Sequence, residues 1–156
     1  ETFPFKGVIW YQGESNEDDA KYGLKQRALI MSWRRKFGAD MPFYFVQLPN
    51  FGEKNKPGDF KMRKYSEIRL LQAESLDLPL TGMAVTTDTA DDNQLHPKNK
   101  LDVADRLSRL ALNDLYGKPQ PNEGRSPVLA AAKRSADAIR RGTSSCIRCP
   151  SGRTAD

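Results

Sequence analysis

The sequence predicts an α/β domain in which a parallel sheet lies between layers of helices. Short apolar segments alternate with longer amphipathic ones, in the order strand, helix, strand, helix, strand, helix. The alternation repeats about every 30 residues, which is typical of right-handed βαβ units. The chain has 156 residues, of which 38% are hydrophobic, and this is enough for one domain with its own core.

The first strand and the first helix lie within residues 6–37. Residues 6–11 are apolar and β-branched, as in a buried strand, and the polar turn 12–16 follows them. A helix is predicted over residues 19–37, ending at Gly38. We expect its buried face to consist of Leu24, Ala28, Leu29, Trp33 and Phe37, and its exposed face to carry Lys25, Arg34, Arg35 and Lys36.

The later elements alternate in the same way. The pattern predicts a strand over residues 42–48, a helix over 60–75, a strand over 82–87 and a helix over 98–116. The strand at 42–48 is almost entirely apolar, so both of its faces are expected to be covered. The predicted buried positions are Tyr65, Ile68, Leu71 and Leu76 for the first of these helices, and Leu101, Ala104, Leu107, Ala111 and Leu115 for the second.

The composition changes at about Gly117. Residues 1–117 hold all 14 aromatic residues and carry no net charge, whereas residues 118–156 carry the entire net charge of +5. A segment without large apolar side chains buries too little area to offset the entropy of ordering it. We therefore predict a body over 1–117 and a disordered basic tail over 118–156, with at most a nascent helix at Val128–Ile139. A shifted reading frame after about Pro121 would account for so abrupt a change.

The composition also excludes several classes of function. No apolar run is long enough to span a membrane. The basic tail has no aromatic residues for stacking and no helical pattern for a groove, so nucleic-acid binding is not expected. Cys146 and Cys149 form an isolated Cys-x-x-Cys pair, and a zinc site needs four ligands, so neither a metal nor another cofactor is expected.

The polar loops after the first and third strands are expected to form the functional site, because the carboxyl ends of parallel strands meet at one edge of the sheet. His96, the only histidine, lies in the later loop together with Asp88, Asp91 and Asp92. An imidazole oriented by a carboxylate at this edge is suited to act as a general base. The alternative is a histidine at a helix start with solvated acidic neighbours.

The turn at residues 12–16 ends the first strand. The side-chain amides of Gln12 and Asn16 and the backbone N–H groups of the turn are suited to stabilise an oxyanion. Ser15 or Asn16 is also suited to cap the following helix, and the two roles are compatible. Ser15 is not expected to be a nucleophile, because its neighbours do not form a Gly-x-Ser-x-Gly elbow.

Two blocks of the sequence, taken together, resemble one known family. Residues 7–16 (Gly-Val-Ile-Trp-Tyr-Gln-Gly-Glu-Ser-Asn) resemble the central block of the sialate O-acetylesterase family, within the SGNH (GDSL-like) hydrolases. Residues 95–100 (Leu-His-Pro-Lys-Asn-Lys), followed by a helix with Arg106 and Leu107, are similar to the C-terminal histidine block of the family. The resemblance covers about residues 5–116.

The resemblance implies a flavodoxin-like three-layer α/β/α domain that hydrolyses acetyl esters on sugars through an acyl-serine intermediate. His96 matches the catalytic histidine, and Gln12 lies in the block that contributes to the oxyanion hole. The acid of the wider superfamily most typically lies three residues before the histidine, where this sequence has Asn93. Asp92 or Asp91 is therefore the candidate acid, unless the enzyme works with a Ser-His dyad.

The resemblance also places the nucleophilic serine in an N-terminal Gly-Gln-Ser-Asn-like block, and residues 1–156 contain no such block. We therefore expect the domain to be incomplete at the N-terminus, with the missing N-terminal segment and an acetylated carbohydrate as its partners, and the isolated chain to be inactive. The resemblance further implies a periplasmic or secreted protein. The alternative is a non-catalytic sugar-binding or structural remnant of the same fold.

Overall fold

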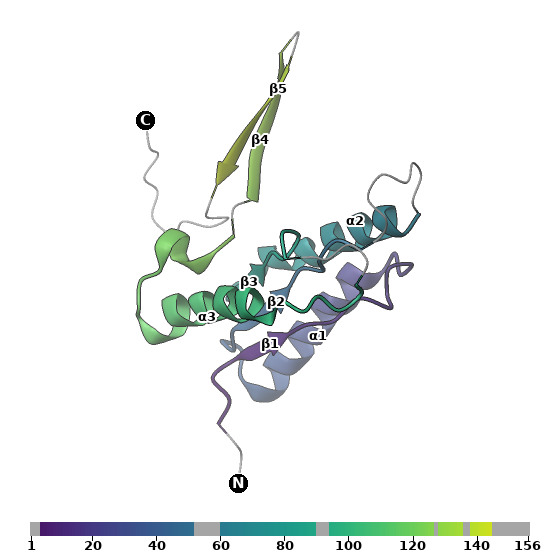
Figure 1. The fold of residues 1–156 in the computed structure, drawn as a ribbon. Coiled ribbons are helices and arrows are strands. Elements are labelled where there is room, and N and C mark those ends of the chain that lie inside the picture. The colour runs from purple at the N-terminus through teal and green to yellow at the C-terminus, as the bar shows by residue number, and fades with distance from the viewer. Residues whose placement is uncertain (1–3, 52–59, 90–93, 127, 136–137, 145–156) are drawn as a thin grey trace.

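The computed structural model describes residues 4–51, 60–89, 94–126, 128–135 and 138–144, and Figure 1 shows their arrangement. Three strands form a parallel sheet in the order β1 (Val8–Trp10), β2 (Phe43–Val46) and β3 (Thr81–Ala84). In the register of the sheet, Ile9 lies beside Tyr44, and Tyr44 lies beside Gly82. The strand–helix alternation of the sequence therefore predicted this sheet correctly.

Helices cover both faces of the sheet (Figure 1). On one face, α1 (Tyr22–Phe37) packs against α2 (Phe60–Ala73), and α2 continues into the short 3₁₀ helix η1 (Glu74–Asp77). On the other face, α3 (Lys100–Tyr116) packs against β2 and β3. The three layers confirm the predicted α/β class.

The central strand β2 sends alternate side chains into two cores. Phe43 and Phe45 pack with Ile30 of α1, whereas Tyr44 and Val46 pack against α3. None of the four β2 residues is more than 2% exposed. The prediction that both faces of this strand are covered is confirmed.

The buried face of α1 differs from the predicted one. Leu24 is 66% exposed and Ala28 is also exposed, although both were predicted to be buried. The prediction that Arg34 faces solvent is wrong as well, because Arg34 is only 5% exposed. The buried residues of α1 are Tyr22, Gly23, Gln26, Ile30 and Arg34.

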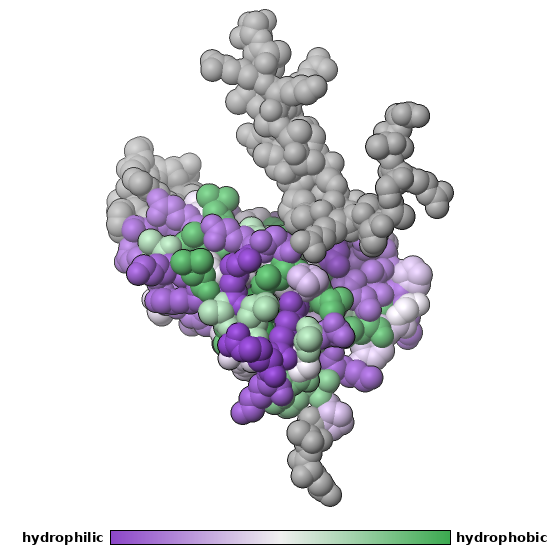
Figure 2. All heavy atoms as spheres, turned by 180° about the vertical axis from the view of Figure 1, so that it is seen from behind, coloured by the Kyte–Doolittle hydropathy of each residue, from purple (hydrophilic) through white to green (hydrophobic). Residues whose placement is uncertain are grey.

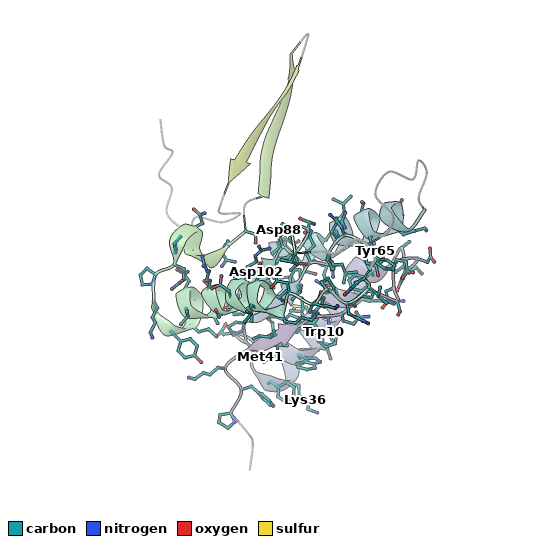
Figure 3. The ribbon with its side chains drawn as sticks, viewed as in Figure 1. Trp10, Lys36, Met41, Tyr65, Asp88 and Asp102 are labelled. Carbon is teal, nitrogen blue, oxygen red and sulfur yellow. The ribbon has the colours of Figure 1, made fainter. Side chains whose placement is uncertain are left out.

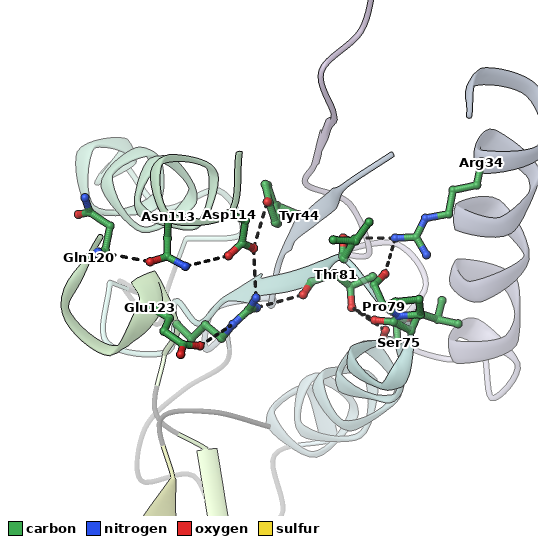
Figure 4. Close-up of polar contacts among 12 residues, drawn as sticks. Arg34, Tyr44, Ser75, Pro79, Thr81, Asn113, Asp114, Gln120 and Glu123 are labelled. Atoms are coloured by element: carbon green, nitrogen blue, oxygen red, sulfur yellow. Dashed lines mark hydrogen bonds and ion pairs between the residues drawn. The ribbon is translucent and has the colours of Figure 1, made fainter. Parts of the chain in front are cut away.

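Arg34 is buried because its guanidinium donates to main-chain carbonyls of two other segments. Nε donates to the carbonyl of Met41 at 3.0 Å, and Nη2 donates to the carbonyls of Pro79 at 2.6 Å and Leu80 at 3.2 Å. Figure 4 shows Arg34 reaching the Pro79 segment from α1. Met41 precedes β2 and Leu80 precedes β3, so Arg34 holds the amino ends of both strands. Burial lowers the pKa of Arg34 from its ordinary value.

The predicted faces of α2 and α3 are confirmed only in part. Tyr65 and Ile68 of α2 are buried, as predicted. In α3, Leu101 is 84% exposed and Ala104 is exposed, so the prediction that they are buried is wrong. The apolar face of α3 is wide, and only the part that meets β2 and β3 is covered. The buried residues of α3 are Val103, Leu107 and Leu110.

The chain remains packed after Gly117, so the prediction that order ends there is wrong for residues 118–126. The 3₁₀ helix η2 (Pro121–Gly124) lies against α3. A Cβ atom placed on Gly124 would lie 2.6 Å from the carbonyl carbon and oxygen of Arg109, and Gly124 has a φ of 73°. Glycine is therefore required at this position by both the close approach and the left-handed backbone.

Arg125 and Ser126 cover the outer edge of β3. Arg125 donates from Nη1 to the carbonyl of Thr81 and from Nη2 to Oδ2 of Asp114, both at 3.1 Å (Figure 4). The hydroxyl of Ser126 accepts the backbone N–H of Val85 at 3.3 Å. Side chains therefore satisfy strand groups that a neighbouring strand would otherwise bind.

The Tyr44 hydroxyl joins the same network and donates to Oδ2 of Asp114 at 3.1 Å. Burial raises the pKa of the Tyr44 hydroxyl far above its ordinary value, and the negative charge of Asp114 adds to the effect. The neutral phenol is thus the form that the fold selects.

A second, two-stranded antiparallel sheet follows. It consists of β4 (Val128–Ser135) and β5 (Ala138–Ser144), and Figure 1 shows it projecting from the body. The composition had predicted disorder here, with at most a nascent helix. A hairpin satisfies backbone N–H and C=O groups without large side chains, which the compositional argument did not consider. Residues 145–156, including Cys146 and Cys149, lie outside the described residues.

Large apolar side chains on the surface of α1 and α2 lie among polar ones. Figure 2, which shows the molecule from behind, has hydrophobic side chains scattered among hydrophilic ones. None of the helices in the described part of the chain combines the length and the apolar character that a membrane crossing requires. Among the described side chains of these two helices, the exposed large apolar residues are Leu24, Met31, Phe37 and Leu70, between 42% and 71% exposed.

Candidate active site

The candidate site lies at the carboxyl edge of the sheet, where the two sequence blocks meet. Tyr11, which follows β1, and Leu95, which precedes His96, both pack against one buried cluster. That cluster consists of Tyr22, Leu48, Tyr65 and Ile68. The loop after β1 and the loop after β3 therefore pack on the same buried cluster, which we call the floor of the site.

A second contact links the same two blocks. The Lys100 ammonium lies 5.2 Å from the centroid of the Tyr11 ring, which is cation–π distance. Lys100 is the first residue of α3 and comes four residues after His96. Residues that are far apart in the sequence are thus neighbours at this edge, as predicted from the strand order.

Gln12 is held within its own turn. Its Nε2 donates to Oδ1 of Asn16 at 2.5 Å, and its Oε1 accepts the hydroxyl of Tyr22 at 3.1 Å. The same hydroxyl also lies 3.0 Å from the Gln12 carbonyl. An amide nitrogen carries two hydrogens, so one contact to Asn16 leaves a second hydrogen for a ligand. The turn is thus a rigid, amide-rich platform.

Gly13 has a backbone that other residues rarely adopt, with a φ of 142°. A Cβ atom there would lie 3.1 Å from Cδ1 of Leu48 and 3.3 Å from the Tyr22 hydroxyl. The turn can therefore approach the floor of the site only because this residue is glycine.

Gln72, a residue that the sequence analysis missed, ties the ends of β1 and β2 together. It is 1% exposed, and its Nε2 donates to the carbonyls of Gln12 and Val46, each at 3.3 Å. Its Oε1 accepts the backbone N–H of Leu48 at 2.9 Å. The available signal was a glutamine four residues after Ile68, on the buried face of a helix.

Tyr65 supports the turn from below. Its side chain, labelled in Figure 3, reaches from α2 and its hydroxyl donates to the carbonyl of Glu14 at 3.3 Å. Burial raises the pKa of this hydroxyl far above its ordinary value, and the negative charges of Glu17 and Glu14 contribute. The phenol stays protonated and remains a donor to the turn.

His96 itself is exposed to solvent in the loop before α3. The following residue, Pro97, is buried, and Asn99 caps α3 by accepting the backbone N–H of Asp102 at 3.2 Å. His96 is therefore placed between two fixed points, Leu95 and the start of α3. The candidate acids Asp91 and Asp92 lie outside the described residues, so their relation to His96 stays a prediction.

Asp88 is paired with Arg106, so it is not a free carboxylate in the loop that carries His96. Its two carboxylate oxygens each lie 2.6 Å from a different terminal nitrogen of Arg106. This bidentate contact holds the pKa of Asp88 below its ordinary value. Figure 3 shows Asp88 near α3, the helix that supplies Arg106.

A small cavity of about 150 Å³ lies beside the turn. Gln12, Asn16 and the buried Gln26 contribute to its lining. Gln26 Oε1 finds no hydrogen-bond partner among the described residues, whereas its Nε2 donates to Gln72 and Ser75. No cluster of three or more potential metal ligands occurs within the described ranges.

A parallel sheet with polar loops and the sole histidine of the sequence at its carboxyl edge is typical of α/β proteins that bind small ligands at that edge. Residues 1–111 match the family described as "Carbohydrate esterase, sialic acid-specific acetylesterase". The chain belongs to this family. The resemblance noted in the sequence is thereby confirmed.

Known relatives agree with this assignment. A sialate O-acetylesterase from Mus musculus is 34% identical over 133 residues, covering 75% of this chain and 25% of the relative. The Homo sapiens sialate O-acetylesterase is 34% identical over 132 residues, covering 72% of this chain and 24% of the relative. The chain therefore spans about a quarter of the length of these relatives.

The fold also matches a solved structure. The crystal structure of a carbohydrate acetylesterase from Xanthomonas citri superposes with a TM-score of 0.76 and 36% sequence identity, over 90% of this chain and 33% of that one. Since 90% of 156 residues exceeds the 117 residues of the predicted body, this match continues past Gly117.

Proposed function

We propose that this chain is part of an esterase that removes acetyl groups from carbohydrates, with His96 as its general base. The observation that carries the proposal is the shared floor at the carboxyl edge. Leu95, next to His96, and Tyr11, next to Gln12, pack on the same buried cluster. Family membership supports the reaction class, and acetylated sugars are the substrate class that the family description implies.

In the proposed reaction, His96 takes the proton of a serine hydroxyl while the serine oxygen bonds to the acetyl carbonyl carbon. The tetrahedral intermediate collapses, the bond to the sugar oxygen breaks, and His96 returns the proton to that oxygen. Water then attacks the acetyl carbon of the acetyl-serine while His96 accepts a proton from the water; the bond from that carbon to the serine oxygen breaks, His96 returns the proton to the serine, and acetic acid leaves, ionising to acetate. The Gln12–Gly13 turn contributes to the oxyanion hole, which stabilises the negative charge on the carbonyl oxygen of the tetrahedral intermediate.

The serine is proposed to come from polypeptide outside these 156 residues. Ser15 is exposed in the turn after β1, and its neighbours do not form a nucleophile elbow. The curated relatives are about four times longer than the matched part, which leaves room for such a segment.

The free edge of β1 is the proposed docking place for that segment. No described strand pairs with this edge, and Ile9 is 63% exposed. Beside it, Trp10, Trp33 and Phe37 form edge-to-face contacts with centroids 6.0 to 6.4 Å apart. An unpaired strand edge with apolar neighbours is suited to accept a further strand.

The test uses a longer polypeptide that contains both these 156 residues and the proposed segment with the nucleophilic serine. His96→Ala is expected to lower acetyl-ester hydrolysis on the order of 10⁴-fold, because the members of a catalytic unit act together. Lys98→Ala, an exposed position two residues away, is the matched control and is expected to retain activity. Near-normal turnover of the His96 variant would exclude the assignment.

A non-catalytic sugar-binding remnant is the second candidate, since the 156 residues contain no block of the nucleophile type. A fluorophosphonate probe distinguishes the two. The isolated chain is expected to remain unlabelled under both readings, whereas the longer polypeptide is labelled at a serine only if it is an esterase. Stoichiometric serine labelling of the isolated chain would contradict the proposed division of the site.

A further inference from the structure

The guanidinium of Arg106, on α3, contacts two residues of the segment that follows β3. Nη1 and Nη2 each contact one carboxylate oxygen of Asp88 at 2.6 Å, and Nη1 also donates to the carbonyl of Val85 at 2.5 Å. A planar guanidinium fixes both position and direction in such a bidentate contact. Asp88 and Val85 belong to the segment that leaves β3 toward His96.

The residues between Val85 and Asp88 are fixed independently. Thr86 is fully buried, and its hydroxyl donates to the carbonyl of Gln47 at 2.6 Å. Thr89 closes a turn by donating its N–H and its hydroxyl to the Thr86 carbonyl, at 3.1 and 2.9 Å. Arg106 therefore attaches a well-formed turn, rather than a loose chain end, to α3.

The other end of the His96 segment is attached to the same helix. Lys100 begins α3 and stacks on Tyr11, six residues before Arg106. At about 1.5 Å per residue, the two attachments are about 9 Å apart along the helix. Helix α3 thus holds both ends of the segment that carries the histidine.

We propose that Arg106 is a positioning residue for His96, acting through Asp88 and the Val85 carbonyl. The inference rests on the proposed function, in which His96 is the general base. Misplacing a catalytic group by about 1 Å can cost on the order of 10²-fold in rate. An arginine that fixes the origin of the loop therefore affects turnover without touching the substrate.

The effect of Arg106 on the position of His96 can be separated from its effect on the stability of the fold. The Arg106 and Asp88 side chains are 26% and 65% exposed, and exposed ion pairs contribute little to the free energy of unfolding. Arg109, three residues further along α3, is a matched control. It forms an ion pair with Asp105 within the helix at 2.8 Å, and no contact among the described residues joins its side chain to the His96 segment.

The first experiment is NMR on the 156-residue chain, in which the single histidine gives one unambiguous set of imidazole signals. Arg106→Gln and Asp88→Asn are each expected to shift or broaden these signals, and the double variant to add nothing further. Arg106→Lys is expected to restore part of the wild-type signal, and Arg109→Gln to leave it unchanged. Unchanged signals in Arg106→Gln, or equal changes in Arg109→Gln, would overturn the proposal.

The second experiment measures acetyl-ester hydrolysis by the same variants in the polypeptide that carries the serine. Arg106→Gln is expected to lower kcat about 10- to 100-fold with little change in KM, and to lower the thermal midpoint only slightly because the ion pair is largely exposed. A normal kcat, or a loss explained by unfolding, would overturn the proposal. Absence of hydrolysis in the wild-type polypeptide would refute the proposed function alone, because the imidazole signals still report whether Arg106 positions His96.

Discussion

Gln72 joins the ends of two neighbouring strands through Gln12. The Gln72 carboxamide lies 3.3 Å from the Gln12 carbonyl and simultaneously accepts the backbone N–H of Leu48 at 2.9 Å. One buried side chain on α2 thus fixes the spacing between the turn after β1 and the loop after β2. The geometry of the candidate site therefore depends on a side chain that is itself buried.

Replacing Gln72 by leucine is expected to destabilise the fold by about 2–3 kcal/mol, since it leaves the buried Leu48 N–H without an acceptor. Urea unfolding measures the change. Leu70→Ala, on the same helix at a position 71% exposed, is the control and is expected to stay within about 0.5 kcal/mol. Equal effects of the two substitutions would refute the role given to Gln72.

Arg34→Leu is expected to destabilise the fold by about 3 kcal/mol, because it removes the donors to the carbonyls of Met41, Pro79 and Leu80. The neighbouring exposed residue provides the comparison. Arg35→Leu removes the same charge from the same turn and is expected to change stability by less than about 0.5 kcal/mol. Thermal unfolding of both variants decides whether burial or charge matters.

Arg34 and Gln72 show which features of the fold could not be predicted from the sequence. Apolar periodicity located the three strands of the parallel sheet and the three α-helices, because these segments bury apolar surface in the expected order, but it did not locate the β4–β5 hairpin. Arg34 and Gln72 were missed because the acceptors that make their burial favourable come from distant segments. Contacts such as Arg34 with Pro79, 45 residues apart, are not visible in local patterns.

For the candidate site, the sequence pattern predicts the edge of the sheet but not the pairing of side chains there. Topology placed Gln12 and His96 at one edge, and the contact of Tyr11 with Lys100 agrees with that placement. Sequence spacing alone does not separate Asp88 from Asp91 and Asp92, because it does not reveal that Arg106 engages Asp88. Side-chain pairing between α3 and the loop decides this, and pairing depends on the folded geometry.

The stability contributed by Asp88 is expected to depend on pH in a defined direction. Arg106 lowers the pKa of Asp88 below its ordinary value of 3.8, so the contribution is present above that pH and is lost as pH falls through the lower, folded value. The thermal midpoints of the wild type and of Asp88→Asn should therefore converge as the pH falls below about 4. The difference should be small and should shrink with added salt, because the pair is largely exposed. A gap that widens on acidification would contradict this assignment.

The boundary of the folded body is expected to lie after Ser126. A chain that ends at Ser126 keeps the contacts of Arg125 with Thr81 and Asp114, and should melt within error of the full chain. A chain that ends at Gly117 loses these contacts, exposes the edge of β3 and leaves the partly buried Tyr44–Asp114 pair without the Arg125 guanidinium. Its thermal midpoint should fall by several degrees, since about 1 kcal/mol corresponds to about 4 °C for a domain of this size.

Gly124→Ala in the full chain separates packing of the 121–126 segment from chain length. An added Cβ at 2.6 Å from the Arg109 backbone should displace η2 and lower the midpoint as the shorter truncation does. Gly117→Ala is a partial comparison, because Gly117 also has a left-handed φ, of 58°, but open space around its Cβ position. It should therefore cost only the backbone strain. Equal midpoints for the chains ending at Gly117 and Ser126 would show that the folded body ends with α3. The contacts of Arg125 with Thr81 and Asp114 would then have no stabilising role.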